Sequence, residues 1–241
     1  MKSQALGLIG KLAIAALGAA ALAAPDARAN TFVAQLEASS SQHSLPQASE
    51  LARLAPSANP DVLRLAVQAL RCADPGAERL AVIDFSMPSN DKRLWVFDLS
   101  ARQLLFSELV SHGRGSGDAM ASQFSNVPES FQSSIGLFRT GSSYSGRNGY
   151  SMRLEGLEAG INDKAFERAI VVHGADYVSE DFIAKNGRLG RSHGCPAVPS
   201  AVAAPLIDSI KDSQYLFSYY PDSDWLENSP FLRCNRQLAS H

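Results

Sequence analysis

The sequence predicts a mainly β domain with a few short helices, preceded by a short helical segment. Three observations support this prediction. From Leu80 onward, short apolar runs rich in β-branched and aromatic residues recur, and Gly- and Ser-rich breaks separate them. Helical patterns are confined to the N-terminal part and to two late segments. The length of 241 residues allows one sizeable domain with an accessory segment.

The composition is that of an ordinary globular protein. Apolar residues make up 45% of the chain and charged residues 19%, which argues against wholesale disorder. The 22 Lys and Arg residues and the 24 Asp and Glu residues give a formal net charge of −2. Because nucleic-acid binding depends on a basic field, we expect no nucleic-acid partner.

Residues 1–29 are predicted to be a secretory signal peptide. Lys2 and Lys11 flank an apolar run, Leu12 to Ala24, and a small-residue cleavage motif ends at Ala29. The run is shorter than the roughly 20 residues that span a membrane. We therefore expect cleavage after Ala29, a periplasmic mature protein and no transmembrane span in that mature chain.

Residues 30–75 are predicted to be a linker followed by a short helical segment. The stretch Ala38 to Ser49 is rich in Ser, Gln and Pro, as in a spacer. Asn59 is a predicted N-cap and Pro60 a first helical residue, and an apolar stripe follows them. We expect this helix to end near Cys72 and to pack on the main domain.

Residues 76–241 are predicted to form the main domain. The predicted strands are 81–85, 94–97, 104–110, 135–139 and 169–172. Ser179 is expected to cap a helix that stops at Gly187, and a second helix is expected after Ser200, where Pro205 could delay its start. The Gly-rich stretches 113–118 and 141–149 are expected to be turns or site loops; no P-loop lysine follows the first of them.

The chain has three cysteines, so in an oxidising compartment one is left over. Cys72 follows the predicted helix and Cys234 lies near the C-terminus, and both look structural. The sequence leaves open whether they form a disulfide with each other. Cys195 differs from them because a polar Arg-Ser-His-Gly stretch precedes it.

The segment 169–198 carries a Cys–His arrangement. His173 ends an apolar run, and Ser192-His193-Gly194-Cys195 follows after a helix and a basic loop. A cysteine becomes a nucleophile when a neighbouring imidazole or positive charge favours the thiolate. A glycine just before the cysteine leaves backbone amides open to an oxyanion.

This segment resembles the catalytic signature of the L,D-transpeptidases, the YkuD-like domain. In that signature a His precedes a Ser/Thr-His-Gly-Cys motif; here 18 residues, 174–191, separate His173 from Ser192. The wider context, 135–138, 149–157 and 168–175, is similar to the murein L,D-transpeptidase subfamily YkuD_2. The resemblance covers roughly Leu80 to Tyr220 and implies a β-sandwich or barrel.

The resemblance also implies residue roles. Cys195 matches the nucleophile and His173 the base, with the Gly174 carbonyl orienting the imidazole. His193 matches a supporting histidine, and the amides of Gly194 and Cys195 match the oxyanion site. The implied donor is a peptidoglycan tetrapeptide stem, which loses its terminal D-Ala to form a cysteine acyl-enzyme. An acceptor amine then gives a 3→3 cross-link or exchanges the terminal D-amino acid, or water resolves the thioester. No metal or cofactor is implied.

One departure concerns the residues after the cysteine. Pro196-Ala197 stand where the family commonly has an apolar residue and then Arg or Asn. We expect Arg191 or Arg188 to substitute for that polar group in holding the substrate carboxylate. Arg191 and Ser192 are therefore candidate substrate-binding residues.

The Gly- and Ser-rich stretch 141–149 and its flank supply two further candidates. Tyr144 and Tyr150 are candidate contacts in the donor groove, with Arg147 between them. His112, beside the first Gly-rich stretch, is expected on the rim of the site rather than in the chemistry.

Three alternatives remain at this point. The same Cys/His site with water as acceptor would make an L,D-carboxypeptidase or endopeptidase. A catalytically silent cell-wall-binding module would keep the fold without the chemistry. A zinc site built from His173, His193 and Cys195 is the third alternative, but their spacing fits no zinc signature.

Overall fold

The computed structural model of the chain describes residues 44–238. The predicted signal peptide and most of the predicted spacer lie outside the described residues. The strands are β1 (Arg79–Asp84), β2 (Leu94–Asp98), β3 (Gln103–Glu108), β4 (Gly136–Gly146), β5 (Gly149–Gly156), β6 (Val171–Ala175), β7 (Ala197–Pro199) and β8 (Tyr215–Tyr219). The helices are α2 (Ala48–Leu54), α3 (Pro60–Ala73), α4 (Glu180–Asn186), α5 (Ser200–Ile210), α6 (Ser223–Asn228) and α7 (Pro230–Leu238).

The eight strands form one mixed sheet in the order β3-β2-β1-β8-β4-β5-β6-β7. Only β1–β8 and β6–β7 pair in parallel among these strands; the other pairs are antiparallel. Beyond β3, the chain pairs at Ser111 with Ala197 of the opposite edge strand. This bridge brings the two edges of the sheet together, so the sheet is nearly closed. The predicted mainly β class is confirmed.

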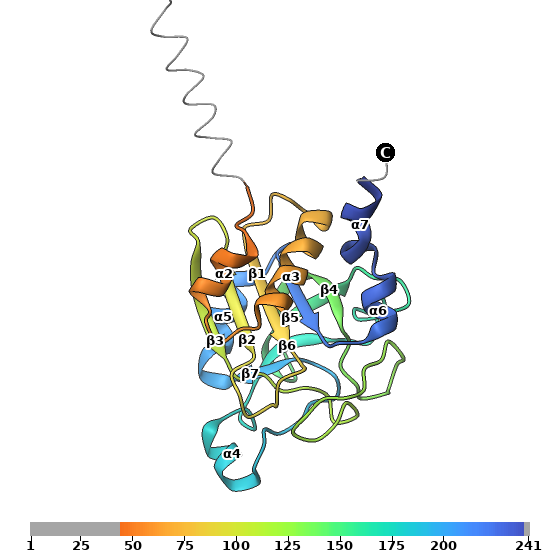
Figure 1. The fold of residues 1–241 in the computed structure, drawn as a ribbon. Coiled ribbons are helices and arrows are strands. Elements are labelled where there is room, and N and C mark those ends of the chain that lie inside the picture. The colour runs from red at the N-terminus through yellow and green to blue at the C-terminus, as the bar shows by residue number, and fades with distance from the viewer. Residues whose placement is uncertain (1–43, 239–241) are drawn as a thin grey trace, which may run out of the picture. The chain divides into compact units, whose positions relative to one another are not determined.

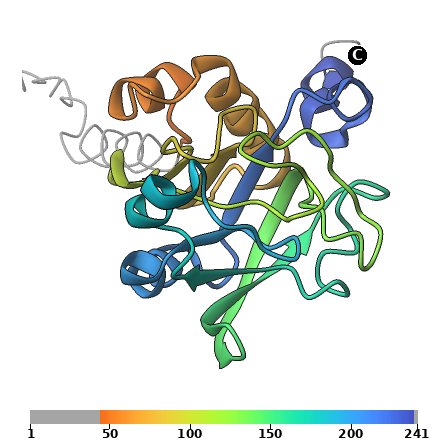
Figure 2. The same ribbon diagram turned by 90° about the horizontal axis from the view of Figure 1, so that it is seen from below.

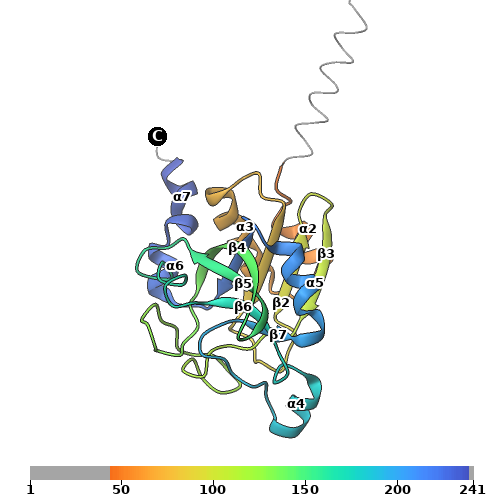
Figure 3. The same cartoon turned by 180° about the vertical axis from the view of Figure 1, so that it is seen from behind.

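The central strands are buried on both faces. Along β1, Leu80 and Val82 belong to one apolar cluster and Ala81 and Ile83 to another, because successive side chains of a strand point to opposite faces. Helix α3 covers the first cluster and α5 the second, as Figures 1 and 3 show from opposite sides. Burial on both faces explains why this strand reads as a continuous apolar run.

The N-terminal segment contains one more helix than the sequence predicts. Helix α2 begins at Ala48, inside the stretch expected to be a spacer. Its start is a capping box in which the Gln47 amide donates to Glu50 Oε2 at 2.7 Å. Helix α3 begins at Pro60 as predicted, and the Asn59 side chain accepts from the Asp61 amide at 2.9 Å.

Two C-terminal helices, α6 and α7, also go beyond the predicted elements. A disulfide joins Cys72 of α3 to Cys234 of α7, with 6.2 Å between the Cα atoms. The structure thus supplies the pairing that the sequence left open, and it leaves Cys195 as the free thiol. The disulfide fastens the end of the chain to the first long helix.

The Gly- and Ser-rich stretch 141–149 is largely strand rather than loop. It forms the end of β4 and the turn into β5, a hairpin whose tip projects from the sheet in Figure 2. Most side chains at this tip are exposed, so the stretch lacks the apolar alternation by which strands are recognised. Helix α4 keeps its predicted limits, with Ser179 as N-cap and Gly187 in the left-handed conformation as C-cap. Helix α5 starts at Ser200 and includes Pro205 without delay.

Among residues 44–238, no helix is both long and apolar enough to cross a membrane.

Candidate active site

The thiol of Cys195 lies at the end of the loop that leads into β7. Its side chain is buried, with 9% exposure. The sulfur accepts a hydrogen bond from the Val171 amide at 3.4 Å and donates one to the Ala169 carbonyl oxygen at 3.7 Å. Two backbone groups at the start of β6 therefore fix the position of the thiol.

His173 lies in β6, paired with Ser151 of β5 and Ala197 of β7. Its Nδ1 atom is 2.9 Å from the Gly174 carbonyl oxygen. Because a carbonyl oxygen only accepts, Nδ1 carries the hydrogen and the neutral ring keeps a free lone pair on Nε2. Gly174 thus occupies the orienting position that the resemblance implied.

Burial sets the charge states of this pair. It lowers the pKa of His173, against the opposing effect of the Gly174 hydrogen bond. Burial also raises the pKa of the Cys195 thiol, while the Val171 amide and the Arg168 charge oppose that rise. The free site at neutral pH therefore holds a thiol and a neutral imidazole, which is the pair that general-base activation requires.

Ser192 organises the backbone around Cys195. Its hydroxyl accepts from the Gly194 amide at 3.0 Å and donates to the Cys195 carbonyl oxygen at 2.6 Å. Its own amide donates to the His112 carbonyl oxygen at 3.0 Å. Ser192 is buried, and both hydrogen bonds of its hydroxyl join atoms of its own loop.

This geometry corrects one expectation for the oxyanion site. The Gly194 amide already donates to Ser192 and is not free for an oxyanion. Within residues 44–238, the His193 and Cys195 amides have no hydrogen-bond partner. Of the two amides expected from the resemblance, the Cys195 amide is the one available.

Two glycines allow the loop to pack against the segment after β3. Gly194 has φ +123°, a conformation that L side chains rarely adopt. A Cβ on Gly113 would lie 2.8 Å from Gly194 Cα and 2.2 Å from the Phe131 carbonyl oxygen. Ser133 completes the contact because its hydroxyl accepts from the Gly113 amide at 2.9 Å and donates to the Gly194 carbonyl oxygen at 3.0 Å.

A pocket of about 300 Å³ opens over Cys195 and His173. Its lining residues are Arg147, Asn148, His173, Tyr177, Arg191, Ser192, His193 and Cys195. The structure therefore brings together five residues singled out from the sequence motif and its lead-in. The tip of the β4–β5 hairpin adds Arg147 and Asn148 to the lining. The chain between β6 and α4 adds Tyr177, and burial raises the pKa of its hydroxyl to about 12.

Two predicted substrate contacts lie elsewhere. The Tyr150 hydroxyl donates to Asp208 Oδ1 on α5 at 2.6 Å, and the Tyr144 ring packs under the Arg153 guanidinium at 4.6 Å. Neither tyrosine lines the pocket. The hairpin reaches the pocket through its turn rather than through these rings, and a substrate contact of either tyrosine stays a prediction.

Arg191 lines the pocket but already has acidic and carbonyl partners. Its Nη1 atom is 2.8 Å from Asp118 Oδ1 and donates to the Gly117 carbonyl oxygen at 2.8 Å. Arg188 also lies near Asp118, at 3.8 Å. Arg147, in contrast, has no ion pair among the described residues and is exposed at the pocket edge.

His112 is not on a rim. Its side chain is fully buried, and Nδ1 lies 2.8 Å from Nη2 of Arg93, which is itself fully buried. Burial lowers the pKa of His112 to about 4, and the Arg93 charge adds to the effect. Nothing in the local sequence marked this residue as interior, because its partner Arg93 lies 19 residues earlier in the chain, just before β2.

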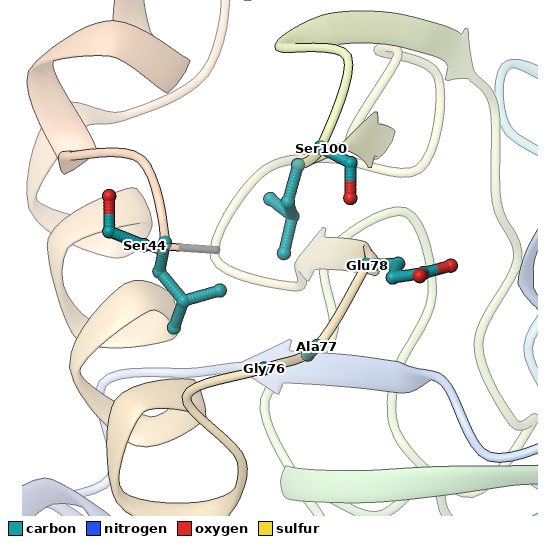
Figure 4. Close-up of a pocket in the computed structure, with 7 residues that line it drawn as sticks. Ser44, Gly76, Ala77, Glu78 and Ser100 are labelled. Atoms are coloured by element: carbon teal, nitrogen blue, oxygen red, sulfur yellow. The ribbon is translucent and has the colours of Figure 1, made fainter. Parts of the chain in front are cut away.

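A second pocket, of about 340 Å³, lies at the start of β1 and is shown in Figure 4. Its lining residues are Ser44, Leu45, Gly76, Ala77, Glu78, Leu99 and Ser100. They include no histidine or cysteine, so this pocket does not supply a Cys–His pair. Across residues 44–238, no group of three or more His, Cys, Asp and Glu residues could hold a metal ion.

A comparison with known families places the whole domain. The model of the L,D-transpeptidase catalytic domain YkuD_2 matches residues 54–219. The chain belongs to this family. The resemblance noted in the sequence is confirmed, and family membership supports an L,D-transpeptidase-type enzyme. The match begins at Leu54 and so includes α3, outside the boundary at residue 76 that the sequence suggested.

Solved structures of L,D-transpeptidases are similar to the chain. They include an L,D-transpeptidase from Mycobacterium smegmatis, at 16% identity over 60% of each chain with TM-score 0.38, and L,D-transpeptidase 3 from Mycobacterium tuberculosis, at 13% identity over 60% of this chain and 62% of that one with TM-score 0.38. The helical cell shape determining protein Pgp2 from Campylobacter jejuni matches at 12% identity over 68% and 56%, with TM-score 0.42. The chain thus spans 60% of the length of the first of these structures. Comparison with curated proteins found no match.

Proposed function

We propose that the protein is a peptidoglycan L,D-transpeptidase that acts on tetrapeptide stems through an acyl-enzyme on Cys195. The observation that carries the proposal is that a buried free thiol and a histidine line the same pocket. His173 is held by Gly174 so that Nε2 keeps its lone pair. Family membership supplies the substrate class.

Acylation proceeds from the thiol state. As Sγ attacks the carbonyl carbon at the L-centre of the third stem residue, His173 Nε2 takes the thiol proton. The Cys195 amide, together with the His193 amide, stabilises the oxyanion. The C–N bond to the terminal D-Ala then breaks, and the imidazolium returns its proton to the leaving amine. The product is a thioester between Cys195 and the tripeptide stem.

Deacylation repeats these steps with an acceptor. The side-chain amine of a second stem attacks the thioester carbon, and His173 accepts the amine proton. The C–S bond breaks, the thiol recovers a proton, and a 3→3 cross-link remains. A free D-amino acid as acceptor would exchange the terminal residue, and water would give the tripeptide.

Arg147 takes the carboxylate-binding role in this proposal. The sequence favoured Arg191 or Arg188, but both lie near Asp118, whereas Arg147 is exposed at the pocket edge. An arginine without an acidic partner is better able to pair with a substrate carboxylate. Arg191 and Ser192 then shape the pocket wall and the loop. The predicted signal peptide would place this chemistry in the periplasm.

Mass spectrometry of the purified protein incubated with disaccharide-tetrapeptide tests the proposal. Wild type and Cys195→Ala are compared, with Arg139→Gln, a substitution in an exposed ion pair, as the matched control. We expect a 3→3 dimer and an acyl adduct on Cys195 in wild type and in the control, and neither in Cys195→Ala. Tripeptide alone would identify the carboxypeptidase alternative. Sacculus binding without products or adduct would identify the silent module.

A further inference from the structure

Arg168 lies just before β6 and inserts its guanidinium into the segment 125–134. Nη1 donates to the Ser125 carbonyl oxygen at 2.5 Å and to Ser134 Oγ at 2.6 Å. Nη2 donates to the Gln132 carbonyl oxygen at 2.7 Å and to Ser130 Oγ at 3.2 Å. The forked guanidinium group therefore holds the segment 125–134 through four hydrogen bonds.

All four acceptors are neutral. No carboxylate within residues 44–238 forms an ion pair with Arg168. Burial lowers the pKa of this guanidinium, and Cys195 is the group whose charge opposes that effect. A partly buried cation without a counter-ion is costly in free energy, and here a negative charge at Cys195 would offset that cost.

The guanidinium also lies against the nucleophile loop. Nη2 is 3.6 Å from the place where a Cβ on Gly194 would stand. The next residue, Ala169, accepts the thiol hydrogen bond, and Val171 donates to the sulfur. Arg168 thus belongs to the short stretch of chain that holds Cys195 in place.

We propose that Arg168 is an electrostatic positioning residue, which holds the segment 125–134 beside the Cys195 loop and supplies the positive charge facing the negative charge that develops at Cys195. This inference rests on the proposed role of Cys195 as nucleophile. It differs from the roles of His173, which moves a proton, and of Arg147, which faces the substrate. Arg168 does not line the pocket, so it acts through the loop and its field.

Other charged or titratable groups face Cys195 from neighbouring elements. His173 and Tyr177 approach from β6 and the chain after it, His193 and Arg191 from the nucleophile loop, and Arg147 from the hairpin tip. Asp118 pairs with Arg191, which reduces the field of that arginine at the thiol. A test of Arg168 must therefore leave all of these groups unchanged.

The rate of Cys195 alkylation by iodoacetamide, measured against pH without substrate, provides that test. The reaction forms an S–C bond, releases iodide and gives the thiol proton to solvent, and its rate follows the thiolate population. Cys72 and Cys234 are joined in the disulfide, so the label reports on Cys195. Because no peptidoglycan is present, a failure here is distinguishable from a failure of the proposed reaction.

Four variants separate charge from structure: Arg168→Gln, Arg168→Lys, Ser134→Ala and Arg139→Gln. The Arg168 charge favours the Cys195 thiolate, and a neighbouring opposite charge shifts a pKa by about one unit or more. Arg168→Gln should therefore slow alkylation at pH 7 about tenfold and move the midpoint of the pH profile upward. Arg168→Lys keeps the charge but loses the fork, and should stay within about threefold of wild type. Ser134→Ala loosens the segment without changing charge, and Arg139→Gln removes a remote charge; neither should move the midpoint.

Two results would overturn the inference. One is an unchanged midpoint in folded Arg168→Gln; the other is an equal shift in Ser134→Ala, which would reduce Arg168 to a structural role. Circular dichroism and thermal unfolding establish that each variant is folded. If Arg168→Gln does not fold, Arg168→Lys decides: a midpoint near that of wild type supports the proposal, and a raised midpoint contradicts it.

Discussion

The Ser192 hydroxyl links the Gly194 amide, at 3.0 Å, to the Cys195 carbonyl oxygen, at 2.6 Å. One buried side chain thus holds both ends of the peptide turn that carries Cys195. Gly194 can adopt its positive φ because it has no Cβ, and these two hydrogen bonds select that conformation from the many open to a glycine. The Cys195 amide is left free as a result.

Ser192→Ala should therefore impair catalysis more than folding. Removing the hydroxyl leaves a buried donor and a buried acceptor unpaired, at a cost of about 1–3 kcal/mol in unfolding free energy. Removal of an oxyanion donor lowers kcat roughly 100–1,000-fold. Because Ser192→Ala displaces the Cys195 amide rather than removing it, we expect a smaller fall in kcat/KM for tripeptide or cross-link formation, roughly 10–100-fold. Ser192→Thr keeps the hydroxyl and is the matched control. Activity of Ser192→Ala within twofold of wild type would contradict this role.

The pH dependence of activity should reflect the buried histidine. His173 acts as a base only when neutral, and burial lowers its pKa from the ordinary value of 6.5. Protonation therefore requires a lower pH than for an exposed histidine, so activity should persist into mildly acidic solution. We expect the acidic limb of kcat/KM to have its inflection below pH 6.5.

A profile of kcat/KM between pH 5 and 9 measures this inflection. His112, with a pKa of about 4, stays neutral throughout that range and does not contribute. An inflection above pH 6.5 would show that a nearby negative charge, rather than burial, governs His173. It would also favour an ion pair between His173 and Cys195 in the free enzyme.

Local signals in the sequence predicted much of the fold. Ser179 and Gly187 delimit α4 because capping depends on residues within one turn of the helix end. The β1 strand was readable because both of its faces are buried. The end of the β4–β5 hairpin was not, because its side chains face solvent and its pairing depends on the partner strand.

The residues of the candidate site likewise fall into those that local sequence identified and those that it did not. Cys195 and His173 were found through their motif, in which both residues lie close along the chain. Ser133 and Arg168 were missed because their partners are distant in the sequence. Ser133 contacts Gly194, 61 residues away, and Arg168 contacts residues that precede it by 34–43 positions. Their residue types are unremarkable where they stand in the sequence, and only the folded chain brings them to the loop of Cys195.

Gly113→Ala should disturb that long-range contact. A Cβ at this position would lie 2.2 Å from the Phe131 carbonyl oxygen and 2.8 Å from Gly194 Cα, both of which are backbone atoms. Backbone has to shift, so we expect a loss of about 1–3 kcal/mol in unfolding free energy together with a large loss of activity. Gly76→Ala is the control, because its new Cβ would meet only the Asp74 side chain, at 3.4 Å. Equal urea midpoints for the two variants would contradict the prediction.

The disulfide between Cys72 and Cys234 should stabilise the fold without serving the chemistry. It closes a sequence separation of 162 residues between α3 and α7, and such cross-links chiefly restrict the unfolded chain. The double variant Cys72→Ala/Cys234→Ala should lose about 2–4 kcal/mol of stability, which lowers Tm by roughly 4–16 °C. Because neither cysteine lines the pocket of Cys195, kcat/KM at 25 °C should stay within about twofold of wild type, which an assay of both proteins at that temperature checks.

Thermal unfolding with and without dithiothreitol, for wild type and the double variant, checks the loss of stability. The reductant should lower the Tm of the wild type toward that of the variant, whose own Tm should not change. An unchanged wild-type Tm under full reduction would show that the packing of α7 alone, including the Gln68 side-chain bond to the Leu232 carbonyl oxygen, holds the C-terminus in place.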